Sequence, residues 1–161
     1  MKKISENNLD GFDFAILELL QDDCRQTADQ ISKKVALSPA AVQKRLKKLR
    51  SGNLIIKEAA IIDRSRIGYQ ITAIIEIQME RENSVVMDAF CNQMRRAPNV
   101  QQCYYTTGET DFFLVLLSKD IKEYELFTKE HLFDNPAVKR FTTSIVTDIA
   151  KIGLEVPLEY E

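Results

Sequence analysis

The sequence predicts an α+β protein in which an N-terminal winged helix-turn-helix precedes a ferredoxin-like βαββαβ domain. Two observations predict this class. Up to residue 52, apolar residues recur at helical spacing between residues that cap helices. From residue 69 onward, strand-like and helix-like segments follow one another in the order β-α-β-β-α-β. We therefore expect a helical domain at residues 1–62, a linker at residues 63–68 and a βαββαβ domain at residues 69–161.

The stretch from Ser38 to Ile56 predicts the helix around which the first domain is organised. Ser38 can accept a hydrogen bond from an early backbone N–H, and Pro39 lacks only a donor that the first turn does not use. The helix should end near Gly52, in the left-handed conformation of a C-terminal cap. Three apolar residues share one face that must be buried: Val42, Leu46 and Leu49. The opposite face is small and polar, then basic: Ala40, Gln43, Lys44, Lys47 and, at its edge, Lys48.

Positive charge is concentrated around this helix. From Lys33 to Lys57 the sequence has eight Lys or Arg residues and no Asp or Glu. Residues 1–60 carry a net charge of +3 (11 basic, 8 acidic), and residues 61–161 carry −5 (11 basic, 16 acidic). The basic half is suited to a phosphate backbone. The alternative is a plain three-helix bundle whose basic face is only solvated.

Two shorter helices fit before this one, which completes a helix-turn-helix whose last helix enters the DNA major groove. The first, at residues 10–23, should bury Phe14, Leu17 and either Leu20 or Leu19. The second, at residues 27–35, should be capped by Thr27 and bury Ile31 and Val35, and the tight turn should be Ala36-Leu37 with Leu37 packed inward. After the helices, residues 53–62 are β-branched enough for two short strands that turn around Lys57-Glu58 as a wing.

The second domain follows from alternation and spacing. Strands are expected at residues 69–80, 100–107, 112–117 and 139–150, the third of them covered on both faces. A helix capped by Ser84 should run to Arg96, and one capped by Asp120 should run to Phe133. The residues expected to face inward from these helices are Val86, Ala89, Phe90, Met94, Ile121, Tyr124 and Phe127. The tail alternates again at residues 152–158 and could add an edge strand, on this subunit or on a neighbour.

Two helices can cover only one face of this sheet, so its other face or its edge needs a partner. Helix-turn-helix proteins commonly bind paired half-sites as dimers. Self-association through the second domain satisfies both requirements.

Composition excludes several classes of protein. No stretch is long and apolar enough to span a membrane, and the N-terminus lacks the apolar core of a signal peptide, so we expect a cytoplasmic protein. Cys24, Cys91 and Cys103 are far apart and odd in number, which suits reduced thiols. With one histidine, His131, which shares a helix stripe with Phe127, and no paired Cys or His motif, we expect no metal site and no cofactor.

Several strings in this order resemble the Lrp/AsnC (feast/famine) family of transcriptional regulators across nearly the whole chain. The matching strings are Leu9-Asp10 with Asp13 and Ile16-Leu17, Asp23-Cys24-Arg25 with Thr27, Ala36 to Leu49, Gly52 with Ile55, Gly68, and Thr107 to Asp111. Arg50 departs from the family, which more often has an acidic residue there. The resemblance implies a RAM/ACT-like second domain, dimers that assemble into tetramers or octamers, and control by a small effector, usually an amino acid.

The turn TGETD provides the chemistry for such an effector site. Gly108 lets backbone approach a ligand, exposed N–H groups can hold a carboxylate, and Asp111 or Glu109 can take an α-ammonium. The family resemblance places this turn at the contact between dimers, with the last strand as the opposing wall. The expected site residues are Thr107, Gly108, Glu109, Thr110, Asp111, Thr142, Thr143 and Ser144. The alternative is a β-turn whose acids are only solvated.

On double-stranded DNA, we expect phosphate contacts from the backbone near Ser38 and from Lys44, Lys47 and Lys48, with Ala40, Gln43 and also Lys44 at base edges. Arg45 lies beside the buried stripe and could serve only to brace the helix. Three rival functions are an enzyme on the βαββαβ scaffold, an effector-independent architectural DNA-binding protein and an interaction module without DNA. The sequence has no nucleophile-base pair, no paired carboxylates on one apolar wall and no metal spacing to support an enzyme. The acid-free basic run disfavours the interaction module.

Overall fold

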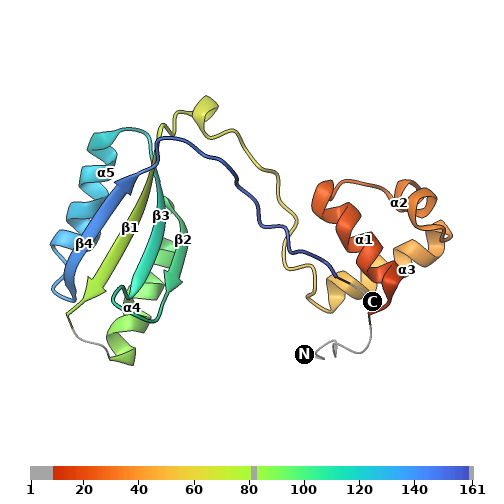
Figure 1. The fold of residues 1–161 in the computed structure, drawn as a ribbon, viewed down its shortest axis with the longest axis horizontal. Helices are drawn as coiled ribbons and strands as arrows, with labels where there is room; N and C mark the ends of the chain where they lie inside the picture. The colour runs from red at the N-terminus through yellow and green to blue at the C-terminus, as the bar shows by residue number, and fades with distance from the viewer. Residues whose placement is uncertain (1–8, 81–82, 160–161) are drawn as a thin grey trace. The chain divides into compact units, whose positions relative to one another are not determined.

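The computed structural model describes residues 9–80 and 83–159 of the 161-residue chain. These residues form two compact units. One contains the helices up to Ile61 together with the tail from Ile152, and the other runs from Ile62 to Lys151. Each unit has its own hydrophobic core. Figure 1 labels the helices and strands of both units.

Three helices make up the first unit: α1 (Gly11–Asp22), α2 (Ala28–Val35) and α3 (Pro39–Ser51). Each begins at a residue whose side chain accepts a hydrogen bond from the first turn: Asp10, Thr27 and Ser38. Their apolar stripes meet in one core of Ile16, Leu20, Ile31, Val35, Val42, Leu46 and Leu49. This arrangement confirms the predicted helix-turn-helix and the predicted buried faces of α2 and α3.

The buried stripe of α1 agrees with the expected one at Leu20 but differs from it at the other positions. Ile16 and Leu20 are buried, together with the carboxylate residue Asp13, whereas Phe14 and Leu17 are only partly covered. The spacing of Asp13, Ile16 and Leu20 is that of one helix face, so the stripe was placed at the wrong angle.

Two of these helices are followed by a residue other than glycine in the left-handed conformation. Ala36 follows α2 with φ 54° and ψ 38°, which is the left-handed conformation. After α3 the left-handed residue is Asn53 (φ 56°), and Gly52 has φ −84°. The helix therefore ends at Gly52 as expected, but the left-handed conformation falls one residue later. Asparagine is the side chain that tolerates this conformation best after glycine.

The expected wing strands are also wrong, because the structure has no strand between Asn53 and Gln70, all of which it describes. Ile55 packs against the helical core, but Ile56 is 92% exposed and Ile61 95% exposed. A two-stranded hairpin is marginal unless one of its faces packs on something. The segment is instead irregular, and Glu58 accepts a hydrogen bond from Arg50 at 2.7 Å. A short 3-10 helix, η2 (Ser65–Ile67), follows and closes at Gly68 with φ 94°.

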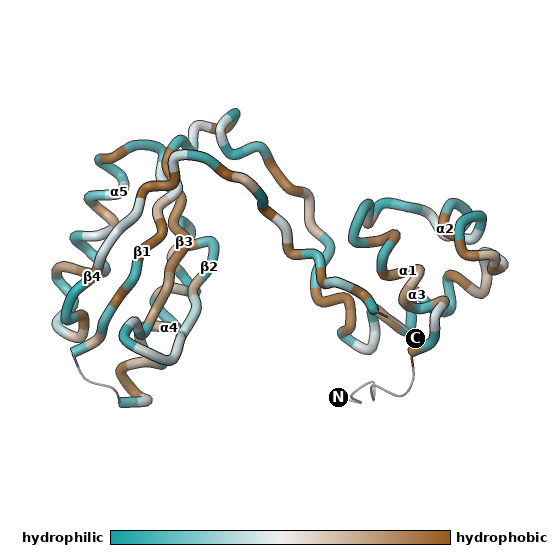
Figure 2. The backbone as a smooth tube through the Cα atoms, in the orientation of Figure 1, coloured by the Kyte–Doolittle hydropathy of each residue, from teal (hydrophilic) through white to brown (hydrophobic). Residues whose placement is uncertain are grey.

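The second unit has the predicted order of elements. Its strands and helices are β1 (Ile71–Met79), α4 (Ser84–Arg96), β2 (Val100–Tyr105), β3 (Phe112–Ser118), α5 (Ile121–Thr128), the π-helical turn η3 (Lys129–Phe133) and β4 (Val138–Ile145). The strands form an antiparallel sheet in the order β2-β3-β1-β4. This order confirms the ferredoxin-like class, with β1 and β3 at the centre. Figure 2 colours much of both central strands as hydrophobic.

Both helices cover the same face of the sheet. The core beneath them contains alternate residues of β1 and β3 together with Met87, Phe90 and Met94 of α4 and Phe127 of α5. Three expectations need correction here: Asn83 rather than Ser84 caps α4, and Ala89 and Ile121 are exposed. Met87 is buried on the same face of α4 as Phe90 and Met94, and Ala89 lies outside that face.

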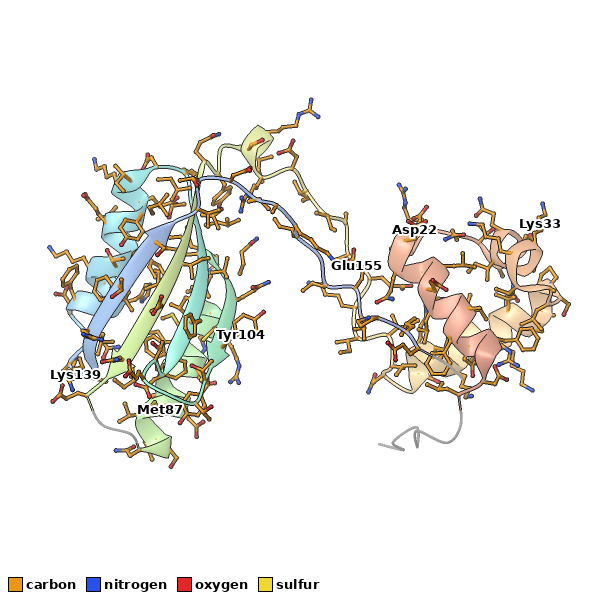
Figure 3. The ribbon with its side chains drawn as sticks, viewed as in Figure 1. Asp22, Lys33, Met87, Tyr104, Lys139 and Glu155 are labelled. Atoms are coloured by element: carbon orange, nitrogen blue, oxygen red, sulfur yellow. The ribbon has the colours of Figure 1, made fainter. Side chains whose placement is uncertain are left out.

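The other face of the sheet is open. By register, Tyr104, Phe113, Glu76 and Thr142 form one row across it, and Gln102, Val115, Ile74 and Ser144 form the next. Tyr104, labelled in Figure 3, is 51% exposed, and Ile74 is 39% exposed. Because Phe113 and Val115 are half-exposed here, the expectation that β3 is covered on both faces does not hold within one chain.

Within one chain, the tail forms no additional strand as far as residue 159, so that alternative is wrong, and a strand on a neighbouring subunit stays a prediction. Residues 146–159 are irregular, and Leu154 is 84% exposed. Within the first unit, Gln21 Nε2 donates to the carbonyl of Val156 at 3.0 Å, and the N–H of Val156 donates to Gln21 Oε1 at 2.7 Å. At Val156 the tail therefore hydrogen-bonds to a side chain of α1, whereas Val146, just after β4, still donates its N–H to the carbonyl of Thr72 in β1 at 2.9 Å.

Candidate functional site

The solvent face of α3 is the polar and basic face that the sequence predicts. Its exposed residues are Ser38, Ala40, Gln43, Lys44 and Lys47. The hydroxyl of Ser38 accepts from the N–H of Ala41 at 3.2 Å, which fixes the helix start. The first turn of such a helix has unpaired N–H groups, which favour an anion. Buried Val42, Leu46 and Leu49 hold the opposite side of α3 in the core.

Acids from outside the basic run neutralise part of its charge. Arg45 pairs with Asp10 and Asp13 of the α1 region, Lys48 pairs with Asp13, and Arg50 pairs with Glu58. Among the described residues, Lys44 and Lys47 form no ion pair. The charge count in the sequence therefore overstates the positive charge that α3 presents to solvent.

The partners of Arg45 and Lys48 converge on one buried carboxylate. Asp13 is 0% exposed, and its Oδ1 accepts from Arg45 Nη1 at 2.7 Å while its Oδ2 accepts from Lys48 Nζ at 3.2 Å. Arg45 Nη1 also donates to Asp10 Oδ1 at 2.7 Å. That hydrogen bond holds the pKa of Asp10 below its ordinary value, and the hydrogen bonds to Asp10 and then Asp13 raise the pKa of Arg45. Arg45 does brace the helix, as its position beside the buried stripe indicates.

Sequence reasoning missed Asp13 as a structural centre, although a signal for it was present. Asp10 and Asp13 have the spacing of a reciprocal cap, and the structure shows both halves of it. Asp13 also shares a helical face with Ile16 and Leu20, which places a carboxylate on a buried stripe. A buried charge requires a basic partner, and this requirement points to α3.

The turn at residues 107–111 connects β2 to β3 and has a defined shape. Thr106 closes it, because its N–H donates to the carbonyl of Asp111 at 2.9 Å and its hydroxyl to the carbonyl of Thr110 at 2.6 Å. Thr107, Gly108 and Glu109 are exposed at the tip. Gly108 has φ 115°, and apart from Gly108 and its two chain neighbours no atom of the described residues lies within 4 Å of the place where a Cβ would be. Backbone at this tip is accessible to a ligand.

The side chain of Asp111 makes a hydrogen bond within the fold that the sequence did not indicate. Its Oδ2 accepts from the N–H of Met79 at 2.7 Å, and its own N–H donates to the carbonyl of Ile77 at 2.9 Å. One carboxylate oxygen therefore fixes the end of β1. The other oxygen, Oδ1, is the one that a ligand would use.

The three expected residues of β4 do not share one wall. Thr142 and Ser144 pair with Glu76 and Ile74 and lie on the open face of the sheet. Thr143 faces the helices, where its Oγ1 accepts from the hydroxyl of Tyr124 at 2.8 Å. Adjacent residues of a strand point to opposite faces, so a wall made of all three was not possible.

One subunit does not bring the turn and β4 together. The turn leads into β3, and β1 lies between β3 and β4 in the sheet. Thr142 is therefore two strands away from the strand that follows the turn.

His131 has the packed position that the sequence predicts. Its ring lies 4.6 Å from that of Phe127, and its Nδ1 is 3.0 Å from Gln93 Nε2 of α4. These contacts connect α5 and η3 to α4 and account for the histidine without a ligand. In the described part of the chain, no helix is both long and apolar enough to cross a bilayer.

Comparison with protein families gives two matches, one to each unit. Residues 9–56 match a family described as winged helix-turn-helix DNA-binding, and residues 72–156 match the Lrp/AsnC ligand binding domain. The first match covers the helices that carry the basic face, and the second covers the sheet and the turn at 107–111.

Several known transcriptional regulators are similar to this chain over most of their own length. An uncharacterised HTH-type transcriptional regulator of Sinorhizobium fredii is 38% identical, over 94% of this chain and 89% of that protein. The transcriptional regulator AzlB of Bacillus subtilis is 35% identical, over 94% of this chain and 96% of that protein. A crystal structure of a Neisseria meningitidis transcriptional regulator in complex with L-Met has a TM-score of 0.87 at 29% identity and covers 93% of this chain and 97% of that chain.

Proposed function

The chain belongs to the Lrp/AsnC family of DNA-binding transcriptional regulators, and we propose that an amino acid bound at the turn 107–111 controls how α3 occupies DNA. The family is one of regulators and not of enzymes. The observation that carries the proposal is Gly108, whose φ of 115° and open surroundings expose backbone at the tip of a turn in the ligand-binding domain. A regulator of this kind acts on the chromosome, which supports a cytoplasmic location.

The DNA-binding half of the proposal uses the solvent face of α3. Lys44 and Lys47 would contact phosphates, and the α3 N-terminus at Ser38 would receive another phosphate. Ala40 and Gln43 would meet base edges, because a small side chain and an amide suit a thymine methyl and an adenine. Lys48 would contribute less than the sequence suggests, since Asp13 holds it.

The ligand-binding half uses opposite charges at the turn. Exposed N–H groups around Gly108 and Glu109 suit a carboxylate, and the outer oxygen of Asp111 or the carboxylate of Glu109 suits an α-ammonium. Thr107 and Thr110 flank these groups. An α-amino acid carries both charges on one carbon. The L-Met complex of the neisserial relative supports this class of ligand.

We also propose that the chain self-associates through the open face of its sheet. Tyr104, Phe113, Val115 and Ile74 put apolar surface there, and a sheet with one bare apolar face is expected to pack against a second layer. A dimer satisfies this requirement, and contacts between dimers would bring Thr142 and Ser144 of another subunit opposite the turn. The assembly would then be a tetramer or octamer.

Control of DNA binding follows from differential affinity. A ligand at subunit contacts changes DNA occupancy only if it binds one assembly or conformation better than another. The coupling is reciprocal, so DNA of the correct sequence should change the affinity for the amino acid by the same factor.

The experiment that tests the proposal is thermal unfolding of the purified protein with each of the twenty amino acids. A ligand at 100 times its Kd stabilises the folded state by about 2.7 kcal/mol. We expect one amino acid, or one chemical class, to raise the Tm, and Asp111→Asn to abolish the shift. Asp88→Asn is the control, because Asp88 is an exposed acid of α4 and is not part of the turn. Equal shifts in Asp111→Asn and the wild type would remove Asp111 from the site and leave Glu109 as the acid of the turn that can bind an α-ammonium.

A further inference from the structure

Asp13 connects α1 to α3 through ion pairs. It is fully buried, yet both its oxygens are used: Oδ1 by Arg45 and Oδ2 by Lys48, both from α3. The N–H of Asp10 adds a longer hydrogen bond of 3.4 Å to Oδ2. A buried carboxylate is stable only when its charge is compensated. Asp13 therefore holds the charged ends of Arg45 and Lys48 beside α1.

The two bases lie on the side of α3 that faces α1. The side chain of Arg45 is 24% exposed and also lies over the ring of Phe12, 5.4 Å from its centroid. The side chain of Lys48 is 38% exposed, one turn before Ser51. The bases that project to solvent without an ion pair, among the described residues of α3, are Lys44 and Lys47.

We propose that Asp13 is a positioning residue for DNA binding that withholds the charges of Arg45 and Lys48 from the phosphate backbone. This inference rests on the proposed DNA-binding role of α3. Asp13 determines which lysines reach phosphates, and it holds α3 against α1 at a fixed angle through the pair with Arg45. Sequence-independent affinity grows with every phosphate that a protein neutralises. Limiting α3 to Lys44 and Lys47 reduces this general affinity and leaves more of the discrimination to contacts at base edges.

The salt dependence of DNA affinity distinguishes this role from a purely structural one. The slope of log K against log salt changes by about 0.9 for each additional phosphate of duplex DNA that the protein neutralises. A variant that only destabilises the domain lowers the fraction of folded protein and leaves this slope unchanged. The slope is therefore the readout, and it is measured with the full-length protein and a fixed duplex, at temperatures where melting curves show every variant folded.

Asp13→Asn keeps the size of the side chain and removes its charge. We expect the salt slope to become steeper by about 0.9, because Lys48 loses the opposite charge of Asp13 and its own charge becomes available to a phosphate. Asp10→Asn is the matched control: Asp10 also pairs with Arg45 but does not contact Lys48, and asparagine still caps a helix. That variant should keep the wild-type slope. An unchanged slope in folded Asp13→Asn would overturn the proposal.

Lys48→Gln gives a second test that does not depend on tolerance of a change at the buried site. If Asp13 withholds Lys48, this variant should keep the wild-type slope, whereas Lys47→Gln should lower it by about 0.9. A decrease of about 0.9 in Lys48→Gln would show that Lys48 already binds a phosphate, which contradicts the proposal. If the wild type shows no salt-dependent affinity and Lys47→Gln changes nothing, the DNA-binding role of α3 fails instead.

Discussion

The hydroxyl of Tyr124 on α5 donates to Oγ1 of Thr143 on β4 at 2.8 Å. This bond lies on the helix-covered side of the sheet, while Thr142 and Ser144, on either side of Thr143, lie on the open face. Three neighbouring hydroxyl residues thus have two different roles. Thr143 ties α5 to the sheet, and only its neighbours can contribute to a site between subunits.

Substitution of these residues should separate stability from ligand binding. Thr143→Val removes the acceptor of a partly buried hydrogen bond and should cost about 1 kcal/mol of stability, with the amino-acid response intact. Thr142→Ala with Ser144→Ala should leave the Tm of the ligand-free protein nearly unchanged and weaken the amino-acid response. Thermal melts with and without ligand measure both quantities. The reverse pattern would place Thr143 in the ligand wall.

Asp111 should contribute separately to the stability of the fold and to the response to an amino acid. Asp111→Ala leaves the N–H of Met79 without its acceptor and should destabilise the protein by about 1–3 kcal/mol. Asp111→Asn retains an acceptor oxygen and loses the charge, so we expect a smaller loss of stability with complete loss of the amino-acid response. Urea unfolding together with ligand titration tests this. Retention of the response in Asp111→Asn would assign the α-ammonium to Glu109.

Ala36→Gly should stabilise the helical unit. Ala36 has φ 54°, and a left-handed residue other than glycine costs about 1–2 kcal/mol. Glycine also loses more entropy on folding, so the expected net stabilisation is about 0.5–1 kcal/mol. Gln43→Gly, in the exposed middle of α3, is the contrasting change and should cost about 1 kcal/mol. Chemical denaturation of both variants checks the signs, and a loss of stability in Ala36→Gly would refute the assignment of strain to Ala36.

A charge on the open face should prevent self-association. Val115 pairs with Ile74 at the centre of the sheet, and its side chain is half-exposed. Val115→Lys should shift the protein to monomers in sedimentation velocity, because burying an unpaired charge in the interface is costly. Asp88→Lys on the exposed face of α4 should leave the assembly unchanged. An assembly of unchanged size in Val115→Lys would show that another surface mediates it.

Cys103 should react slowly with alkylating reagents. Burial raises its pKa from 9.0 to about 11, with the nearby Cys91 contributing. At pH 8 the difference of about two pKa units lowers its thiolate fraction about 100-fold, and the thiolate is the reactive form. The stability that the neutral thiol provides should be present below about pH 9 and disappear as the pH rises through about 11. Iodoacetamide labelling followed by mass spectrometry, with Cys24 as the internal comparison, tests the rate. Equal rates at both cysteines would contradict it.

Local patterns predicted most of the fold because each element has its own signal. Capping residues such as Thr27 and Ser38, the apolar stripe of α3 and the alternation of β1 are all readable from neighbouring residues. The wing and the tail could not be predicted in the same way. Their alternating apolar residues resemble strands, but a strand needs a partner, and which partner is available depends on the tertiary fold.

The residue types of the candidate site were predictable, but the ion pairs between α3 and α1 were not predicted. The exposed face of α3 and the glycine turn at 107–111 follow from residue types and spacing. The ion pairs of Arg45 and Lys48 with Asp13 join residues more than thirty positions apart (32 and 35), and no periodicity within α3 reveals them. The two faces of β4, by contrast, follow from strand geometry, and Thr143 should have been separated from its neighbours on that ground.

The central claim is that an amino acid at the turn changes DNA occupancy. It is tested most directly by fluorescence anisotropy of the full-length protein on a duplex selected from a random library, titrated with and without each amino acid. We predict that one amino acid, or one class, changes the apparent Kd by at least about fivefold, which is a typical coupling between two sites, and that Asp111→Asn binds the same duplex without responding. Identical binding curves with all twenty amino acids would contradict the claim and leave an effector-independent DNA-binding protein.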